Sequence, residues 1–424
     1  MSELHFEPPP DERPGILARF VVDTRPLRVQ HFRRLWFGQA ISLMGSMISF
    51  VAVPYQLYQL THSTVQVGLL AVADLIPLLT LAMVGGTIAD AVDRRRLLLI
   101  TEVGFALTSL ALAWNASLEH PRVWALYLLA FAGASCWCLG SPALRSLTPR
   151  IVPDEQITAA VALNSVYSNL GAVAGPALGG LLVAAFGLTT TYLIDFASFA
   201  ASLVAIWLLP TIPPAPEAEK AGLGSLVEGL RFVWSRRVIM GIFLVDSNAM
   251  IFGMPSALFP ALAAHRFHAG AGTVGLLYAA PYAGALAASI FSGWIGRISR
   301  QALAVAVFAG AWGLALIGFG FAEALWLALV FLALAGAADF VSAALRTTIV
   351  LQATPDPMRG RVSGIELAQV AAAPTLGNVE AGLVAALTSL RFSIVSGGFL
   401  CVAGTAVLVA AIPDIVRYRA RAAT

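Results

Sequence analysis

Charged side chains are scarce in this sequence. Asp, Glu, Lys and Arg make up only 12% of its 424 residues, while 58% of the residues are apolar. A soluble domain usually carries about 25% charged residues, and a soluble protein this apolar would expose large hydrophobic patches. The three cysteines, Cys136, Cys138 and Cys401, all lie in apolar runs, which argues against a disulfide framework or a metal site. The composition indicates an integral membrane protein.

Other expected signals are also missing. The sequence has no Gly-x-x-x-x-Gly-Lys phosphate loop, so we do not expect it to hydrolyse ATP. No nucleophile lies in an obvious pattern with a base, so we predict neither an enzyme nor a bound cofactor. The net charge of +3 gives no reason to expect a nucleic-acid partner. Residues 1–26 are polar and rich in proline, which is typical of a cytoplasmic tail rather than a signal peptide.

Twelve apolar runs are present, and each is long enough to cross a hydrocarbon core of about 30 Å as a helix. Most linkers between them are short, so consecutive helices should be antiparallel. We therefore predict an all-α membrane protein with twelve transmembrane helices. The expected spans are residues 35–60, 64–90, 97–116, 123–147, 157–185, 189–209, 237–262, 272–297, 302–321, 324–349, 363–388 and 392–412.

A polar, proline-rich stretch interrupts the apolar runs after the sixth span. Its second part, residues 224–234, suggests a short helix on the membrane surface. The stretch divides the chain into two halves of six spans each. The expected parts are an N-terminal tail (1–26), a first six-helix bundle (27–209), a central linker (210–235), a second six-helix bundle (236–413) and a C-terminal tail (414–424).

The arginines predict the orientation in the membrane. If both termini are cytoplasmic, the outer loops hold only Arg122, Arg266 and Arg391, and the other loop arginines all lie inside. This distribution follows the positive-inside rule, and the opposite topology would invert it. We expect a multi-pass protein of the inner membrane with cytoplasmic termini.

The two halves contain related segments in the same order. Val67–Leu70 recurs as Val274–Leu277, and Ala143–Arg145 recurs as Ala344–Arg346. Such a parallel repeat indicates a duplicated six-helix unit. We therefore expect two pseudo-symmetric bundles with a central cavity between them.

A charged hairpin joins the second and third spans. Gly86, Asp90, Arg94 and Arg95 have the spacing of the signature loop of the major facilitator superfamily, although Ala91 and Asp93 depart from its commonest form. This resemblance implies that Asp90 latches the two halves together on the cytoplasmic side when the cavity faces outward. Its expected partner is the stretch 362–366, with Arg145 as a nearby countercharge. The alternative is that these residues only cap helices at a solvated turn.

The fifth span contains glycines at four-residue spacing around a proline. Such glycines let another helix approach closely, and the proline bends its own helix. The arrangement resembles the antiporter motif of the same superfamily, which implies export coupled to proton entry. The alternative is a packing helix with a kink. The motif residues are Gly171, Gly175, Pro176, Gly179 and Gly180.

Three aspartates lie inside apolar spans, namely Asp74, Asp246 and Asp339. A charge in such a position costs about 2.5–3.5 kcal/mol on insertion scales, so a reason is needed. Each either lines the cavity and carries a proton, or forms hydrogen bonds between helices. Asp339 and Arg346 are two helical turns apart, which suggests one network.

Some residues are candidates for cargo contact. Tyr278 and Tyr282 share a helix face and either stack on an aromatic cargo or belong to the aromatic belt at the membrane interface. Arg145 and Arg346 are expected near the inner mouth, where they either attract an anionic cargo or extend to the interface. Acidic residues nearer the span ends, Glu102, Asp195 and Glu366, are expected to reach water.

More specific matches cover nearly the whole membrane region. The segments 53–56, 61–68, 275–280 and 354–361 resemble the enterobactin-exporter branch of the major facilitator superfamily, which also contains drug and macrolide exporters. The resemblance implies export of a small amphipathic molecule, such as a siderophore, by alternating access with inward proton flow. A multidrug or macrolide exporter is one alternative, and a sensor or scaffold that transports nothing is another. We expect a monomer.

Overall fold

The computed structural model describes residues 23–210 and 223–419, without the side chains of residues 82–91, 223–226 and 357. Within these ranges the chain forms helices and contains no strand. The helices are α1 (Gln30–Thr61), α2 (Thr64–Ala91), α3 (Arg94–Ser117), α4 (Val123–Ile151), α5 (Ile157–Trp207), α6 (Leu223–Ser235), α7 (Arg237–Phe252), α8 (Phe259–His265), α9 (Ala271–Ile290), α10 (Gln301–Phe321), α11 (Leu325–Ala353), α12 (Asp356–Leu387), α13 (Leu390–Ala411) and α14 (Asp414–Arg417), with short 3₁₀ turns η2 (Arg25–Arg28), η3 (Asp154–Gln156), η4 (Pro255–Leu258) and η5 (Ser292–Arg297).

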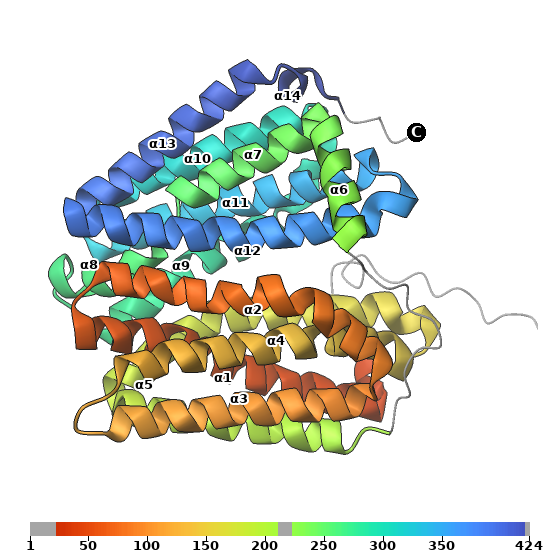
Figure 1. Cartoon of the computed structure of the whole chain (residues 1–424), viewed down its shortest axis with the longest axis vertical. Coiled ribbons are helices and arrows are strands. Elements are labelled where there is room, and N and C mark those ends of the chain that lie inside the picture. The colour runs from red at the N-terminus through yellow and green to blue at the C-terminus, as the bar shows by residue number, and fades with distance from the viewer. Residues whose placement is uncertain (1–22, 211–222, 420–424) are drawn as a thin grey trace, which may run out of the picture.

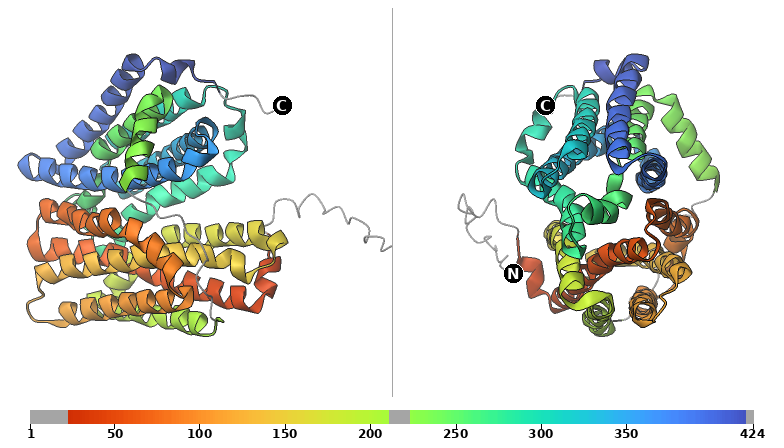
Figure 2. Two further views of the ribbon diagram at one scale, coloured as in Figure 1. Left: turned by 45° about the vertical axis from the view of Figure 1, so that its right-hand side comes forward. Right: turned by 90° about the vertical axis from the view of Figure 1, so that its left-hand side faces the viewer.

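The helices form two bundles that lie side by side (Figure 1). The first bundle contains α1–α5 and the second contains α7–α13, with α2 and α12 facing each other across the boundary. The short helices η2, α6 and α14 lie at the same end of the molecule, which we call the tail end (Figures 1 and 2). The opposite end, where α1 turns into α2, is called the turn end.

Eleven stretches of the described chain are long and apolar enough to cross a membrane. One of them holds α5, which is 51 residues long and is broken at Gly187, where φ is +76° and ψ is 172°. L-amino acids with a Cβ rarely adopt this backbone conformation, so glycine is required there. The two arms of α5 are antiparallel, so this one stretch crosses twice. The eleven stretches of the described ranges therefore make twelve crossings. The predicted fold class is therefore confirmed.

Short polar residues stabilise several of the turns between crossings. His62 ends α1 in the left-handed conformation, with φ at +50°. Asp93 caps α3 by accepting a hydrogen bond from the Arg96 amide at 3.2 Å. Ser389 caps α13 in the same way, through the Phe392 amide at 3.1 Å. Each of these contacts satisfies a backbone group that a helix end leaves free.

The seventh, eighth and eleventh predicted spans differ most from the structure, and the eleventh differs because α12 begins at Asp356. The seventh span is not one helix, because Gly253 ends α7 and Pro255 opens the turn η4 before α8. The eighth span is shorter than predicted, since α9 ends at Ile290 and residues 292–297 form the turn η5. The predicted helix at residues 224–234 corresponds to α6.

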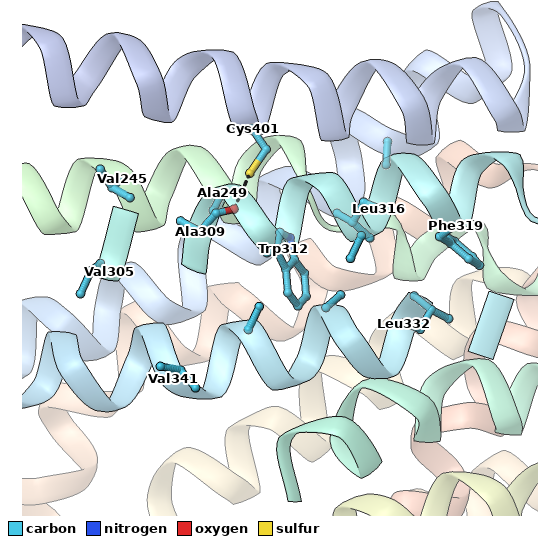
Figure 3. Close-up of a cluster of buried hydrophobic side chains, with 14 of the residues drawn as sticks. Val245, Ala249, Val305, Ala309, Trp312, Leu316, Phe319, Leu332, Val341 and Cys401 are labelled. Atoms are coloured by element: carbon cyan, nitrogen blue, oxygen red, sulfur yellow. Dashed lines mark hydrogen bonds between the residues drawn. The ribbon is translucent and has the colours of Figure 1, made fainter. Parts of the chain in front are cut away.

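The second bundle has an apolar core in which α7, α10, α11 and α13 meet (Figure 3). Trp312 lies at its centre, and its indole Nε1 donates a hydrogen bond to the Gly253 carbonyl at 2.9 Å. Cys401 lies beside the same helix and its Sγ contacts the Ala309 carbonyl at 3.4 Å (Figure 3). The indole thus fills the core and satisfies the carbonyl exposed where α7 ends.

Helices α9 and α11 approach each other through glycines. A Cβ atom built on Gly336 would lie 1.9 Å from the Pro281 carbonyl oxygen, and one on Gly284 would lie 1.8 Å from the Ala333 oxygen. These obstacles are backbone atoms, so no side-chain movement can relieve them. The two helices can keep this separation only with glycine at both positions.

We predict that Gly336→Ala destabilises the second bundle by about 1–3 kcal/mol, the usual cost of overpacking. Gly310→Ala is the matched control, because a Cβ there meets nothing within 4 Å and alanine favours a helix by about 1 kcal/mol. Thermal unfolding in detergent should show a lower melting temperature for Gly336→Ala and an unchanged or higher one for Gly310→Ala. Equal melting temperatures for the two variants would contradict the close packing.

Candidate functional site

The two bundles contact each other closely at the turn end. The Thr64 hydroxyl of α2 donates to the Gly382 carbonyl of α12 at 2.8 Å. Tyr58 of α1 shares a hydrogen bond with His265 of α8 at 2.8 Å between its hydroxyl and the ring Nε2. These contacts join the halves through residues that begin or end a crossing.

The glycines of the fifth span divide between two neighbours. A Cβ on Gly171, Gly175 or Gly179 would meet α1, at Leu43, Met47 and Ile48 respectively. Gly180 faces the other way, and its Cβ would lie 2.4 Å from the Ala271 carbonyl and 2.8 Å from the Cα of Gly275 on α9. The glycine stripe therefore packs α5 within its own bundle, and Gly180 brings α5 against the second bundle. Pro176 is buried in the same stretch.

At the tail end, two glycines in the first turns of α12 have open space beside them. Among the described residues, a Cβ on Gly360 or Gly364 would meet nothing within 4 Å. Gly86 and Asp90 lie in the last turns of α2, but their side chains are outside the described residues. Arg145 is exposed on α4. The expected latch contact of Asp90 is therefore a matter for experiment.

The arginines that follow Asp90 lie in the first turn of α3. Arg94 is buried, with 3% of its surface exposed. The Arg95 guanidinium donates to the Trp207 carbonyl at 2.5 Å. Because Trp207 is the last residue of α5, this cation lies at the negative end of a helix dipole, where it is favourable.

A cavity of about 570 Å³ lies mainly within the first bundle. Its walls come from α1–α4 and from the second arm of α5, while the second bundle contributes Met254, Ser256, Ala257, Tyr278 and Asn378. Most of the wall is apolar or aromatic, with a few hydroxyl and amide groups. We expected a cavity between the bundles, and the structure places most of it on one side of the boundary.

Two carboxyl groups line this cavity, those of Asp74 and Asp195. No lysine, arginine or histidine is among its described lining residues. Tyr278 also contributes to the wall, and its hydroxyl donates to the Ser256 carbonyl at 3.1 Å. Its ring packs edge-on against Phe50 and Phe259, at centroid distances of 5.4 and 4.9 Å. Tyr282, one turn further on, is 41% exposed and does not line the cavity.

Asp246 lies in a charge network inside the second bundle, away from the cavity. It is 3% exposed and forms an ion pair with Arg346 of α11. The Gln369 amide donates to the Asp246 Oδ2 at 2.8 Å, and the Glu366 carboxyl lies 3.7 Å from Arg346. Helices α7, α11 and α12 are thus joined by a paired buried charge.

This network differs from the sequence expectation in two respects. Arg346 pairs with Asp246 and Glu366, whereas we expected Asp339 as its neighbour. Arg346 is also only 5% exposed, so it is not a free cation at the inner mouth. The expectation failed because spacing along one helix does not reveal which neighbouring helix faces a side chain. Asp339 lies on α11 near Tyr282.

We expected Asp195 and Glu102 to reach water near the span ends, but both side chains are buried within the first bundle. Asp195 is 1% exposed and Glu102 is 7% exposed. The Ser109 hydroxyl donates to Asp195 at 2.8 Å, and the Gln39 amide donates to Glu102 at 2.8 Å. A signal was present in the sequence, because polar residues lie seven positions apart on each of the three helices α1, α3 and α5, at 42 and 49, at 102 and 109, and at 195 and 202.

The described residues hold no group of three or more His, Cys, Asp or Glu side chains that is arranged to bind a metal ion. Asp195 and Glu102 receive hydroxyl and amide donors, and Asp246 pairs with a guanidinium group. The cavity of about 570 Å³ gives the site room to enclose a small molecule.

Comparison with known proteins gives consistent matches. A family model described as a transmembrane secretion effector matches residues 22–420. Over 389 residues the chain is 32% identical to proteins named enterobactin exporter EntS in Citrobacter koseri and in Shigella boydii serotype 18. These alignments cover 92% of this chain and 93% of each relative.

Solved structures share the fold at low sequence identity. A POT family transporter in complex with 5-aminolevulinic acid matches with a TM-score of 0.72 and 14% identity, over 91% of this chain and 96% of that one. A bacterial homolog of the human lysosomal transporter Spinster, described as inward-facing and unoccupied, matches with a TM-score of 0.69 and 15% identity, over 95% of this chain and all of that one. At these identities the likeness concerns the fold alone.

We predict that Arg346→Gln destabilises the protein by about 3–5 kcal/mol, because it leaves the buried Asp246 without its countercharge. Adding Asp246→Asn should restore part of the loss. Arg359→Gln is the control, since Arg359 pairs with Asp356 on the surface and such pairs contribute about 0–1 kcal/mol. Thermal unfolding in detergent measures all three, and an Arg346→Gln variant as stable as the control would refute the assignment.

Proposed function

We propose that this chain, which belongs to the transmembrane secretion effector family of the major facilitator superfamily, exports a small amphipathic molecule of the siderophore type. The observation that carries the proposal is its similarity to enterobactin exporters over 92% of its length. A match of that extent covers both bundles and the residues of the cavity wall.

The geometry supports a transport cycle of the alternating-access type. The bundles touch closely at the turn end, through Gly180 and Thr64, whereas glycines at the tail end of α12 have open space beside them. Rocking one bundle against the other would close the tail end and open the turn end around a fixed cavity. A cavity of about 570 Å³ is of the size that binds drug-sized ligands.

We assign the tail end to the cytoplasm. The loop arginines gather at that end, and the positive-inside rule then orients the chain with both termini inside. The conformation described above is accordingly open inward, which is the state that loads cargo in an exporter. The protein would act in the inner membrane, and we propose that it acts as a monomer.

Protons are the proposed driving force. One proton moving inward across about 100 mV releases about 2.3 kcal/mol. Asp74 lines the cavity, where a proton and a cargo molecule would compete for the same space. The Gly180 contact with α9 supports an antiport role for the fifth span, because close backbone packing leaves no room there for a leak of ions.

A drug or macrolide exporter is the second candidate function. The observation that favours it is the pair of carboxyl groups on a cavity wall without a described cationic side chain. Such a wall suits neutral or cationic amphipathic molecules better than anionic ones. A non-transporting sensor of the same fold is the alternative from another class.

Transport by the purified full chain in sealed lipid vesicles tests these readings. With a proton gradient imposed, we expect movement of enterobactin against its concentration gradient, driven by protons flowing the other way. Erythromycin and the cationic dye ethidium are tested in parallel. Movement of erythromycin or ethidium alone would replace the siderophore reading with drug export. No movement of any of the three, together with no proton flux, would favour the sensor.

We predict that Asp90→Asn slows export while the protein still inserts and folds, because the latch across the tail end loses its charge. Asp93→Asn is the matched control. Asp93 caps α3, and asparagine caps helices as well as aspartate does. Initial export rates in vesicles compare the two at equal amounts of inserted protein, and wild-type rates for Asp90→Asn would remove the latch from the mechanism.

A further inference from the structure

A polar seam runs through the first bundle between α1, α3 and the second arm of α5. Its members lie on three facing helix surfaces, and every one except Ser49 is buried. The side chains are joined to one another by hydrogen bonds rather than by ion pairs. The seam consists of Gln39, Ser42 and Ser49 from α1, Glu102 and Ser109 from α3, and Asp195 and Ser202 from α5.

The seam has two levels. On each of the three helices, its members include two residues that are seven positions apart, which is about two helical turns or 10 Å along the bundle. Asp195 belongs to the level that lines the cavity, together with Ser49 and Ser109. Glu102 belongs to the level nearer the tail end, since it lies in the first half of α3.

The hydrogen bonds of Asp195 are distributed unevenly. The hydroxyls of Ser49 and Ser109 both donate to Oδ2, the second at 2.8 Å. The other oxygen, Oδ1, is buried and accepts no hydrogen bond from the described residues. A buried carboxylate with one unpaired oxygen is costly. A neutral carboxyl with its proton on Oδ1 avoids burying the negative charge, and Oδ2 still accepts both hydroxyls.

Glu102 is held in a similar way. The Gln39 amide donates to its Oε1 at 2.8 Å and the Ser42 hydroxyl donates to its Oε2 at 3.3 Å. The same Gln39 amide donates to Ser202 at 2.7 Å. Neither Glu102 nor Asp195 forms an ion pair with a described residue. The contrast with Asp246 is direct, because the charge of that acid is already balanced by Arg346.

We propose that Asp195 and Glu102 are the two proton-binding positions that couple export to proton entry. This inference rests on the proposed proton-driven export. Each carboxylate takes one proton from a hydronium ion that enters by way of the cavity, which forms an O–H bond, at Oδ1 in Asp195, and leaves water. When the tail end is open, Glu102 and Asp195 return their protons to water on that side, which forms hydronium and restores each carboxylate.

Other ionisable groups lie around this pair. Asp74 of α2 shares the cavity with Asp195, so a charge on one favours a proton on the other. Cys136 of α4 is close enough to Glu102 to interact with it electrostatically. Tyr192, one turn before Asp195, donates its hydroxyl to Gln56 at 2.9 Å. None of these groups is a cation that would hold either acid in its charged form.

Infrared difference spectroscopy of the full chain in lipid vesicles tests proton binding without any cargo. As the pH is raised, wild-type protein should lose the carbonyl stretch of protonated carboxyl groups. Asp195→Asn and Glu102→Gln should each remove a component of that signal, whereas Thr101→Val should leave it unchanged. Thr101 is the control because it is buried beside Glu102 and its hydroxyl bonds only its own helix, at Leu98. A full signal in both acid variants would overturn the proposal.

Transport of enterobactin in the same vesicles separates coupling from a structural role. Both acid variants should lose uptake driven by a pH gradient, down to the level of protein-free vesicles, and should keep one-for-one exchange of labelled for unlabelled enterobactin. Retained pH-driven uptake would refute the inference, and loss of both activities would assign the seam to folding only. If wild-type protein moves no enterobactin, the proposed function fails, and the infrared result still decides on proton binding.

Discussion

The approach of two backbones at the crossing of α5 and α9 is the constraint on which the arrangement of the bundles depends. Gly180 and Gly275 face each other there, and neither position has room for a side chain. The contact between Gly180 and Gly275 therefore depends on close packing of the two backbones, and it can form and separate without breaking an ion pair.

Buried charge is handled differently in the two bundles. In the second bundle, Asp246 is neutralised by Arg346, so three helices are tied together permanently. In the first bundle, Asp195 and Glu102 receive only hydroxyl and amide donors. An acid with such partners tolerates both protonation states, because the donors can rotate. The repeat in the sequence thus extends to the helices of the two bundles, but the buried acids of the two bundles have different kinds of partner.

Much of the fold followed from the sequence, because the lengths of the apolar runs and the short linkers leave few arrangements open. The twelve crossings and helix α6 were predicted in this way. The residues of the site were harder to predict from the sequence than the fold. Asp74 lies on the cavity wall, but Asp195 was judged by its distance from the span end, and its burial is set by α1 and α3, which precede it by many residues. The ion-pair partner of Arg346 was missed for the same reason. The spacing of residues along one helix does not show which residues of another helix they contact.

The single-residue joint at Gly187 has a mechanical consequence. It connects the two arms of α5 with no flexible loop between them, and Gly180 lies seven residues before it while Asp195 lies eight residues after it. At such a joint the two arms of α5 can move relative to each other only about one point. Because no loop separates the two arms, a displacement of the first arm away from α9 would also shift the start of the second arm, which carries Asp195.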